Sequence, residues 1–504
     1  MNIVTHKNIK LSRILWQKLY QLIIVRLEGK LINTQKYRDD ILALVEDGIG
    51  GVIVFGAQIT PLKEFIKEIQ AAAEIPLIVA SDIERGVGQQ VQGANHFPGQ
   101  MALCAALSSG SNEDIALLHD TIDAIICEAI DIGINMPLIP VMDVNLNPSN
   151  PIICTRAFSD DPAVVSWYGC QIIERIEKAF LISTAKHFPG HGDTAVDSHI
   201  TLPIINKSIK QLEGVELVPF KAAIKQGVSA IMAGHLSIPD IDDMPASISK
   251  NALTGLLRQG LGFEGLIITD ALNMDALNGI GGLPVRCLNA GADIILHPLD
   301  AHKTVKELFG AINNGVLTED VVDRALFRIL KVKEKFKYIQ PKPLDIQRHA
   351  TLSNYISGRS ITLVNGHHTG FLTKNANLIL VGEGEHYEKT LLRGYFNKIY
   401  TIADILDQQP LPNEVIVCAV FTSVSAWKGS SGLSDEHIKI IKSLLQNSKS
   451  SMVISFGSPY ILNSFKEADS LVAAYEPSQG AQIAVIECLK GNITPQGTLP
   501  IRLS

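Results

Sequence analysis

The feature that most constrains the fold is a regular alternation of short apolar runs and amphipathic stretches through the first two thirds of the chain. The runs have the length of β-strands, and the stretches between them carry apolar residues at helical spacing. Continuous apolar strands separated by helices indicate parallel strands that are buried on both faces. The predicted strands are residues 19–25, 52–55, 77–80, 138–141, 181–185, 229–232, 266–268 and 293–296.

Eight strand–helix units of this length favour a closed (β/α)8 barrel of the TIM type. A large doubly wound open sheet is the alternative. The alternation lapses after residue 335, where the polar, proline-bearing residues 338–343 suit a linker. A second, shorter strand–helix series follows and indicates a smaller α/β layered domain, a sandwich of helices and sheet. We therefore predict the barrel over residues 1–340, a linker over 341–350 and the second domain over 351–504.

Composition and charge exclude several classes of protein. Hydrophobic residues make up 46% of the chain and charged residues 19%, which is typical of a soluble enzyme and not of a disordered chain. A net charge of -7 without a long basic run argues against nucleic acid as a partner. No apolar run has the length of a membrane span, and the N-terminal residues lack a signal-peptide pattern. Seven scattered cysteines without a Cys-x-x-Cys pair predict thiols in a reducing compartment, hence a cytoplasmic protein.

Polar side chains follow five of the predicted strands at the point where each strand ends. These residues are Asp82, Asp143, Lys186, His187, His235 and Asp270. In a barrel the carboxyl ends of the strands meet at one face, and that face carries the active site. Each residue alone could be a turn residue or a helix cap. Together they predict a ring of hydrogen-bond donors and acceptors round one mouth.

Titratable residues are densest in residues 186–199, which hold three histidines, two aspartates and one lysine. Pro189 and the glycines beside it exclude a helix, so this stretch is a shaped loop carried by a strand end. His187 and His191 therefore cannot bind a metal from one helical face, and no glutamate completes a His-Glu-x-x-His motif. We expect neither a metal nor another cofactor.

This loop resembles that of the family-3 glycoside hydrolases, specifically of their β-N-acetylglucosaminidase (β-hexosaminidase) branch. The likeness covers residues 186–194 and the Asp-Ser-His sequence at 197–199, and it extends along much of the chain. Further matching segments are residues 81–84, 95–103, 140–145, 155–158, 261–274 and 497–501. The resemblance implies an exo-acting, retaining enzyme that removes terminal β-linked N-acetylglucosamine, with peptidoglycan fragments as the expected substrates.

The resemblance also implies a role for each matching residue. Asp270 matches the catalytic nucleophile, and His199 matches the general acid/base, oriented by Asp197. An imidazole suits this second role because its unperturbed pKa of about 6.5 lets it donate and then accept a proton. The residues that match sugar-binding positions are Asp82, Arg156, Lys186 and His187. Structural readings stay open, with Asp270 as a helix cap, His199 as a structural histidine and Asp197 as a loop stabiliser.

Two departures from the family pattern bear on substrate detail. Arg85 follows Glu84 where the family often has glycine, and Gln90 stands where it usually has arginine. The mouth thus loses one cation and can gain another, and glutamine does not reproduce a bidentate arginine contact. His191 and Asp193 are expected to shape the loop.

Other functions fit parts of the sequence. Phosphorolysis at the same site would release a sugar 1-phosphate, and a neutral histidine base repels phosphate less than a carboxylate does. β-Glucosidase is less favoured because Ala271 follows Asp270, where relatives of that kind usually carry tryptophan. A non-catalytic sugar-binding protein would have lost the nucleophile or the Asp–His pair. In each case the partner is a small carbohydrate, such as an N-acetylglucosaminide or a muropeptide. The oligomeric state and the reach of the loop at residues 423–432 stay open.

Overall fold

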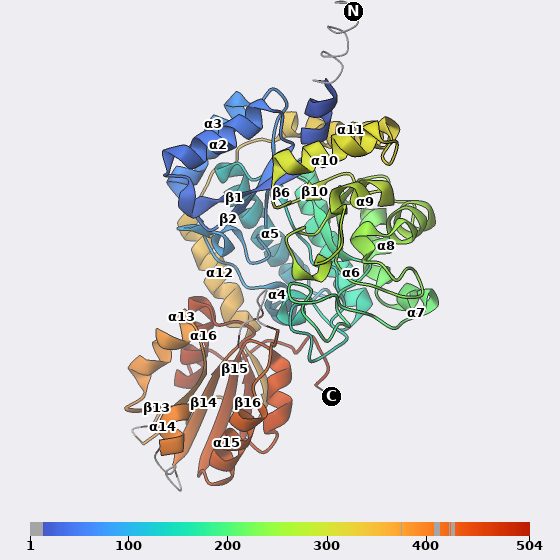
Figure 1. The fold of residues 1–504 in the computed structure, drawn as a ribbon. Helices are drawn as coiled ribbons and strands as arrows, with labels where there is room; N and C mark the ends of the chain where they lie inside the picture. Colours follow the sequence, from blue (N-terminus) through green and yellow to red (C-terminus); the bar gives the residue numbers. More distant parts are fainter. Residues whose placement is uncertain (1–13, 374, 408–413, 423, 425–428, 504) are drawn as a thin grey trace, which may run out of the picture.

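The computed structural model describes residues 14–373, 375–407, 414–422, 424 and 429–503. The N-terminal part, blue to yellow in Figure 1, lies above the C-terminal part, which is orange to red. Residues 1–13, on which the expectation about a signal peptide rests, lie outside the described residues, as do residues 423 and 425–428 of the loop named above.

Parallel strands form the core of the N-terminal part. They are β1 (Ile23–Glu28), β2 (Gly51–Phe55), β4 (Ile78–Ser81), β6 (Met136–Pro137), β7 (Thr184–Phe188), β8 (Ala230–Ala233), β9 (Leu266–Thr269) and β10 (Ile295–Leu296). They make two curled sheets, one in the order β10-β1-β2-β4-β6 and one in the order β7-β8-β9. Isolated bridges join the sheets at both junctions, Val141 with Lys186 and Ile268 with Ile294.

The predicted alternation of parallel strands and helices is confirmed, and the closed barrel is seen in part, as two curled sheets without a continuous ladder between them. The interruption after β6 has a local cause, because Pro137 and Pro140 have no N–H to donate to a neighbouring strand. The predicted start of the first strand at residue 19 is wrong. Residues 14–20 are helical, and β1 begins at Ile23.

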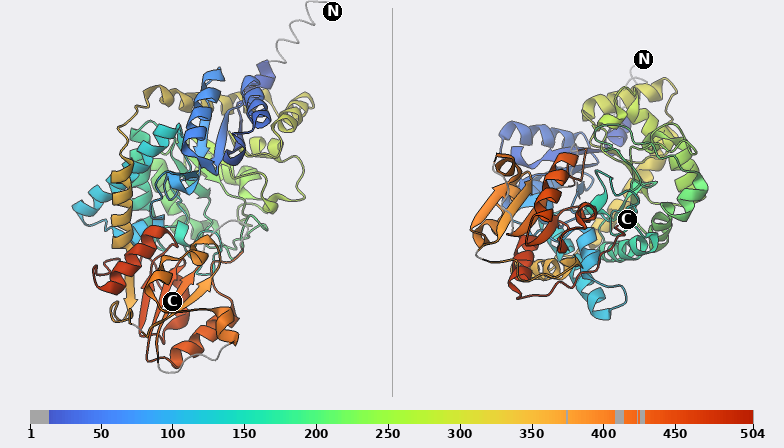
Figure 2. Two further views of the ribbon diagram at one scale, coloured as in Figure 1. Left: turned by 90° about the vertical axis from the view of Figure 1, so that its left-hand side faces the viewer. Right: turned by 90° about the horizontal axis from the view of Figure 1, so that it is seen from below.

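Helices connect the strands and surround the sheets, as the right-hand view of Figure 2 shows. They are α2 (Gln35–Glu46), α3 (Ile59–Ala72), α5 (Asn112–Ile132), α6 (Pro162–Lys178), α7 (Ile209–Gly214), α8 (Leu217–Gln226), the π-helix η5 (Asn251–Gly260), α9 (Leu283–Ala290), α10 (Ala301–Asn313) and α11 (Glu319–Lys333). Their ends follow local chemistry. The Asp161 carboxylate accepts the first N–H groups of α6, which has proline at its first position, and α5 ends at Gly133 with a φ of 99°.

A small parallel ladder lies beyond the ends of β2 and β4. It pairs β3 (Ala57–Gln58) with β5 (Val91–Gln92), and Ala57 N–H donates to the Gln90 carbonyl at 2.9 Å. The short helix η2 (Val87–Gln89) leads into β5, and α4 (Gln100–Ala106) follows it. These segments build up the rim of the barrel on the side of β1, β2 and β4.

The C-terminal part has one six-stranded sheet in the order β11-β16-β15-β14-β12-β13. Its strands are β11 (Thr362–Asn365), β12 (Asn377–Gly382), β13 (Lys398–Thr401), β14 (Val415–Phe421), β15 (Ser450–Phe456) and β16 (Ser470–Ala473). The pairs are parallel except for β11 with β16. The helices are α12 (Ile346–Ser360), α13 (Glu385–Glu388), α14 (Ile402–Asp407), α15 (Asp435–Gln446) and α16 (Gln479–Lys490).

Both faces of this sheet are covered, which explains its continuous apolar strands. Along β14, Ile416, Cys418 and Val420 belong to the apolar cluster that includes α15, and the alternate residues belong to the cluster that includes α16. Side chains of successive residues in a strand point to opposite faces, so one strand serves two cores. The predicted α/β layered domain is confirmed.

The two parts are joined by packing as well as by the chain. Helix α12 packs on α4 and α5 of the first part and on α16 of the second. Ser353 Oγ donates to the His96 carbonyl at 2.7 Å, and Met101 of α4 belongs to a core cluster of the second sheet. Because α12 begins at Ile346 and contacts both parts, the domain bounds at residues 340 and 351 stay a prediction.

Lys333 is buried at the end of the barrel opposite the mouth. The residue is 3% exposed, and its Nζ donates to Gln21 Oε1 at 2.9 Å and to the Gly50 carbonyl at 2.8 Å. No carboxylate of a described residue forms an ion pair with it. Burial lowers the pKa of Lys333 to about 7.

We expect this buried amine to make stability depend on pH. In the unfolded chain a lysine keeps its proton up to about pH 10.4, so between about pH 7 and that value the unfolded state binds more protons than the folded state. The destabilisation is therefore complete below about pH 7 and is relieved as the pH rises. Urea denaturation between about pH 6 and about pH 9 should show the free energy of unfolding rising more steeply for the wild type than for Lys333→Met. Lys331→Met, which changes an exposed lysine of the same helix, is the control. Parallel pH profiles for Lys333→Met and the wild type would contradict the lowered pKa.

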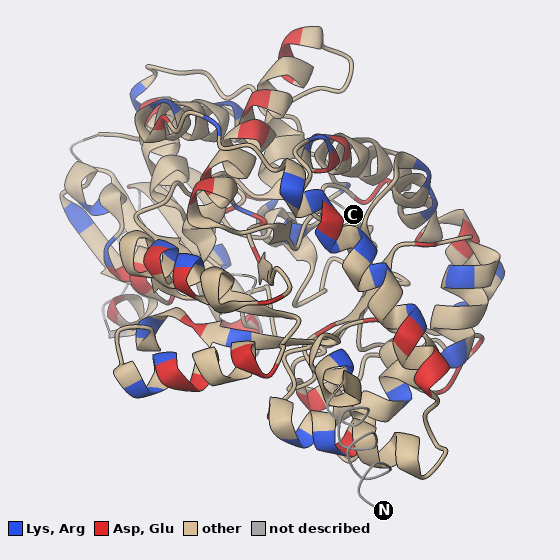
Figure 3. Ribbon diagram, turned by 90° about the horizontal axis from the view of Figure 1, so that it is seen from above, with Lys and Arg blue, Asp and Glu red and all other residues tan. Residues whose placement is uncertain are grey.

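Charges of both signs are interspersed on the outer helices in the view of Figure 3. Among the described residues, no helix is both long enough and apolar enough to cross a bilayer.

Candidate active site

A cavity of about 400 Å³ opens at the carboxyl ends of the barrel strands. We call it the mouth cavity. Six of the seven predicted site residues line it: Asp82, Arg156, Lys186, His187, His199 and Asp270. Asp197 is fully buried and lies behind His199. The fold thus brings residues from five different strands and loops to one space, with the predicted nucleophile and the predicted acid/base on the same cavity.

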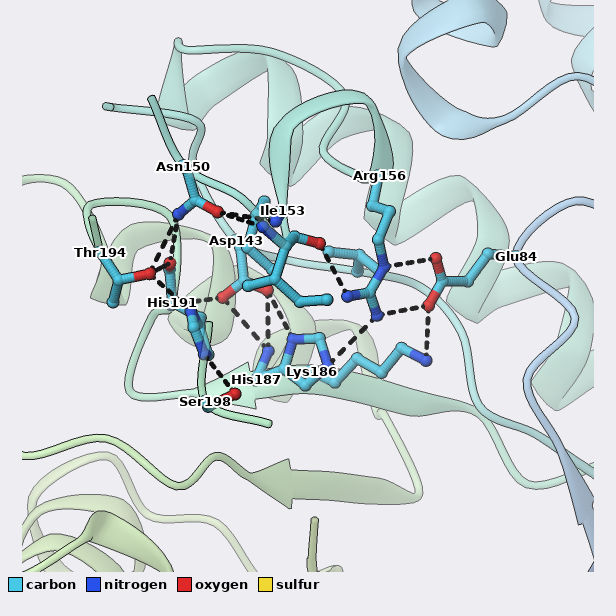
Figure 4. A network of polar contacts seen from close by, with 12 residues as sticks. Glu84, Asp143, Asn150, Ile153, Arg156, Lys186, His187, His191, Thr194 and Ser198 are labelled. Atoms are coloured by element: carbon cyan, nitrogen blue, oxygen red, sulfur yellow. Dashed lines mark hydrogen bonds and ion pairs between the residues drawn. The ribbon is translucent and has the colours of Figure 1, made fainter. Parts of the chain in front are cut away.

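A cluster of charges from the ends of β4 and β7 and from the short helix Cys154–Arg156 forms one wall. Lys186 Nζ lies 2.7 Å from both Asp82 Oδ1 and Glu84 Oε1. The Arg156 guanidinium binds the Glu84 carboxylate with both arms, at 2.9 Å from Nε and 2.8 Å from Nη2 (Figure 4). Glu84 therefore holds the two cations side by side, and the two cations fix Glu84.

The charges of this cluster stabilise one another in spite of burial. Burial alone would raise the pKa of Glu84, but Arg156 and Lys186 hold it well below its usual range. Burial alone would lower the pKa of Lys186, but the Asp82 and Glu84 carboxylates raise it overall. Glu84 and Lys186 are therefore both charged near neutral pH, and the wall offers preorganised donors and acceptors to a polar ligand.

His187 is held by the carboxylate of Asp143, which lies in the segment after β6. Asp143 Oδ2 lies 2.7 Å from His187 Nδ1, and Oδ1 accepts the His191 backbone N–H at 2.6 Å. Burial opposes ionisation of Asp143, yet the nearby imidazole of His187 lowers the pKa of this carboxyl overall. Because Nδ1 is engaged, Nε2 is the ring nitrogen on the side of Arg156, whose Nη2 is 3.5 Å away.

His199 and Asp197 form a close pair. Asp197 Oδ1 lies 2.9 Å from both the backbone N and Nδ1 of His199. The side chain of His199 is 22% exposed and that of Asp197 is fully buried, so the carboxylate supports the imidazole from inside the loop. Nε2 is the ring nitrogen that Asp197 does not engage. This geometry suits proton transfer by Nε2, with the ring orientation set by the carboxylate.

Asp270 follows β9 and is anchored by the backbone. Its N–H donates to the Ala233 carbonyl at 2.9 Å, and its Oδ1 accepts the Ala271 N–H at 2.8 Å. Burial alone would raise the pKa of Asp270, but His187, His235 and His199 outweigh it and the pKa falls to about 2. The carboxylate is therefore ionised near neutral pH, as a nucleophile requires.

The loop that carries the Asp–His pair is fixed by a chain of buried hydrogen bonds (Figure 4). Asn150 Nδ2 donates to the His191 carbonyl at 2.9 Å and to Thr194 Oγ1 at 3.2 Å. Thr194 Oγ1 lies 3.0 Å from His191 Nδ1, and Ser198 Oγ lies 2.9 Å from Nε2. Burial lowers the pKa of His191 to about 4, so this ring is neutral and holds Ser198, the residue between Asp197 and His199.

Two members of the predicted ring do not reach the mouth cavity. Asp143 is fully buried behind His187, as described above. His235 is also fully buried, with Nε2 3.0 Å from the Ala271 carbonyl and Nδ1 2.7 Å from Ser247 Oγ. Both residues are strand-end side chains that support cavity residues, and strand position alone does not distinguish these two roles. Asp193, predicted to shape the loop, forms an ion pair with Lys207 at 2.8 Å.

Several residues that line the cavity were not among the predicted site residues. Glu84 stands two residues after Asp82, a spacing that places both carboxylates on the same side of an extended segment, and this signal could have identified it. Arg85 and Gln90, noted as departures from the family pattern, both line the cavity. Val424 also lines it, so the C-terminal part contributes to the site.

The described residues near Val424 contact the loop that carries the Asp–His pair and the Asn150 segment bonded to it. Ser431 Oγ donates to the Asn150 carbonyl at 3.0 Å. A Cβ added to Gly429 would lie 3.2 Å from Ile200 Cδ1, so these two segments are in contact. Of the loop at residues 423–432, Val424 therefore reaches the barrel mouth. Among the described residues, no group of three or more His, Cys, Asp and Glu side chains is arranged to hold a metal ion.

Comparison with known proteins gives the class and then the family. Residues 14–332 match the glycosyl hydrolase family 3 N-terminal domain, and residues 390–490 match the bacterial glycosyl hydrolase family 3 C-terminal domain. With the two-part α/β fold and the polar cavity, these matches define a glycoside hydrolase. The chain belongs to glycosyl hydrolase family 3, as its loop sequence indicated.

Relatives in the family carry related names. A β-N-acetylglucosaminidase/β-glucosidase from Cellulomonas fimi is 30% identical over 341 residues, which are 63% of this chain and 59% of that protein. β-Hexosaminidase A from Pseudoalteromonas piscicida is 32% identical over 323 residues, 57% of this chain and 53% of that protein. The chain thus spans between half and three fifths of these relatives. A solved family 3 β-N-acetylglucosaminidase from Paenibacillus sp. str. FPU-7 is 29% identical, with a TM-score of 0.83 over 97% of this chain and 99% of that one.

Proposed function

We propose that the protein is an exo-acting β-N-acetylglucosaminidase that works by a retaining mechanism through a covalent glycosyl-enzyme. The observation that carries this proposal is that Asp270 and His199 line one cavity together with the charge cluster round Glu84. The names of the relatives support N-acetylglucosamine as the terminal sugar. We also propose that the two curled sheets act as one closed (β/α)8 barrel over residues 1–340, with the second domain at 351–504.

In the first step, an Asp270 carboxylate oxygen attacks the anomeric carbon of the terminal sugar. The bond from that carbon to the glycosidic oxygen breaks, and His199 gives its Nε2 proton to the departing oxygen. In the second step, water attacks the anomeric carbon, its proton passes to His199, and the bond to Asp270 breaks. The Asp197 carboxylate engages Nδ1 of His199 and fixes the orientation of the ring for both steps.

The charge cluster binds the hydroxyl groups of the terminal sugar in this proposal. Asp82 and Lys186 present an acceptor and donors from a fixed ion pair, and on the neighbouring wall Arg156 presents donors and His187 its ring nitrogen Nε2. Since Glu84 locks the two cations, the site is ready before the sugar arrives, which reduces the entropy lost on binding. We propose peptidoglycan fragments as the natural substrates. We propose the cytoplasm as the compartment, because the scattered cysteines indicate a reducing environment.

Phosphorolysis is the second candidate, and the imidazole at the acid/base position favours it. A neutral histidine does not repel an incoming phosphate as a carboxylate does, and Arg85 on the lining adds a cation. β-Glucosidase activity is a third possibility, and binding without catalysis is the least supported. Hydrolysis is our first choice because water needs no binding site of its own.

The test is product analysis on an aryl β-N-acetylglucosaminide, with and without inorganic phosphate. Hydrolysis predicts free N-acetylglucosamine, released first as the β-anomer, at a rate that phosphate does not change. A sugar 1-phosphate as the main product would replace hydrolysis by phosphorolysis. The aryl β-glucoside in parallel measures the choice of sugar, and a higher kcat/KM on the glucoside would contradict the proposed substrate.

A further inference from the structure

A second, larger cavity lies beside the mouth cavity, between the barrel rim and the C-terminal part. We call it the interdomain cavity. Its volume is about 1170 Å³, against about 400 Å³ for the mouth cavity. Gln89 and Gln90 line both cavities, so the two cavities are adjacent. A volume above the usual ~300–1,000 Å³ of small-molecule sites has room for more than one small group.

The floor of the interdomain cavity is the β3–β5 ladder. Gln58 is paired directly with Gln92, and Ala57 with Val91. Ala57 and Val91 are buried, whereas Gln58 and Gln92 are exposed. Because side chains alternate along a strand, the two glutamines project together from the outer side of the ladder into the cavity. They are adjacent amides on a fixed scaffold.

The lining is rich in neutral groups that hydrogen-bond. The side-chain amides of Asn33, Gln58, Gln90 and Gln92 line the cavity, and none of them makes a hydrogen bond to another described residue. An amide carries two donor hydrogens and one acceptor oxygen. This combination matches the hydroxyl and acetamido groups of sugars, each of which also donates and accepts.

The charges on the lining are few. Lys30 and Glu385 are the lysine and the carboxylate among the lining residues, and Glu385 pairs with Lys389 at 2.8 Å. Burial lowers the pKa of His96, so that ring is neutral near pH 7. The first residues of α16 also face the cavity, but the Glu476 carboxylate lies 2.7 Å from Ser478 Oγ at the helix start and offsets its dipole. The cavity therefore favours a neutral polar ligand over one with several carboxylates.

We propose that the interdomain cavity binds the leaving part of a neutral oligosaccharide, namely one or more further β-linked sugar units beyond the scissile bond. This inference rests on the proposed function, because the terminal sugar must occupy the mouth cavity. The C-terminal part then takes part in substrate selection through the starts of α13 and α16. Gln479 at the start of α16 and the amides of the barrel rim contact the same sugar chain, so the leaving group is recognised only in the assembled two-part structure.

The test compares two substrates in the wild type and in the double variant Gln58→Ala/Gln92→Ala. One substrate is an aryl β-N-acetylglucosaminide, and the other is the β-1,4-linked trisaccharide of N-acetylglucosamine. We expect kcat/KM on the trisaccharide to fall about tenfold, the loss of two ordinary hydrogen bonds, and kcat/KM on the aryl substrate to stay within about twofold. The control is Gln226→Ala/Gln259→Ala, which removes two exposed glutamines from the opposite end of the barrel and should change neither value.

The outcomes separate this inference from the proposed function. An equal loss on both substrates, or no loss on the trisaccharide, overturns the cavity assignment. A muropeptide serves as a third substrate. If the double variant loses activity only on the muropeptide, the proposal of a neutral ligand is wrong and the cavity binds a peptide-bearing one. If the wild type cleaves neither substrate, the proposed function fails, and calorimetric titration with the trisaccharide then decides the cavity. About tenfold weaker binding by the double variant supports the cavity, and equal binding overturns it.

Discussion

Replacing Asp270 by alanine should reduce kcat on aryl β-N-acetylglucosaminide by about 10⁴-fold or more, with the fold intact. The physical reason is that no other described carboxylate on the mouth cavity is available to replace it, since Asp82 and Glu84 are bound to cations. The pKa of about 2 keeps Asp270 ionised in the resting site, so its loss removes both the attacking group and a buried negative charge. Steady-state kinetics with circular dichroism as a check of folding measures the effect.

Small nucleophiles provide a sharper test of the same role. In Asp270→Ala the space of the carboxylate is open to azide or formate, and azide should restore cleavage and form the α-glycosyl azide, with inverted configuration. Asp243→Ala, which removes an exposed carboxylate, should keep full activity with or without azide. Full activity in Asp270→Ala without any added anion would exclude the nucleophile assignment.

Replacing His199 by alanine should lower kcat/KM by about 10²–10⁴-fold on a disaccharide, the usual contribution of a general acid. The loss should be much smaller on a dinitrophenyl glycoside, whose leaving group needs little protonation. For that substrate kcat/KM reports the first step, which needs little help from an acid, whereas the second step, which needs a base, limits kcat. The ratio of the two losses is the measurement, and it separates proton transfer from a general structural effect because both substrates are tested on the same variant.

Asp197→Asn extends this test to the residue behind His199. The amide keeps the shape of the side chain but replaces the carboxylate that holds Nδ1 of His199, so the ring is oriented less well for proton transfer to the leaving group. We expect the same direction of substrate dependence as for His199→Ala, with a smaller loss. Equal losses on the two substrates in both variants would show that the pair acts on folding or binding and not on proton transfer.

Much of the fold could be predicted from the sequence because the pattern that encodes it is local. A strand buried on both faces must be apolar throughout, and a helix covering it must be apolar on one side, so the alternation along the chain states the class of fold directly. The strand bounds were less predictable. Residues 19 and 20, predicted as the start of the first strand, belong to a helix, and β6 stops at Pro137 where the apolar run continues. Hydrogen bonding to neighbouring strands decides these ends.

The candidate site likewise has a part that could be predicted from the sequence and a part that could not. Asp270, Lys186 and His187 stand at strand ends, and Asp197 and His199 lie two residues apart on one loop, so their grouping is written in the sequence. Strand position could not show that Asp143 and His235 point behind the cavity and not into it. That depends on the packing of each side chain against the next strand, which no local pattern records.

By itself, the sequence determined the alternating fold, the residues at the strand ends and the family to which the chain belongs, because these depend on residues close together in the chain. Only the tertiary structure decided that Glu84 holds Arg156 and Lys186 together, that Val424 reaches the mouth cavity and that Gln58 lies beside Gln92. Each of these contacts joins segments from different strands or from both parts of the chain. The physical reason is that ion pairing, burial and cavity shape depend on distances in space, which are set when the separate elements pack.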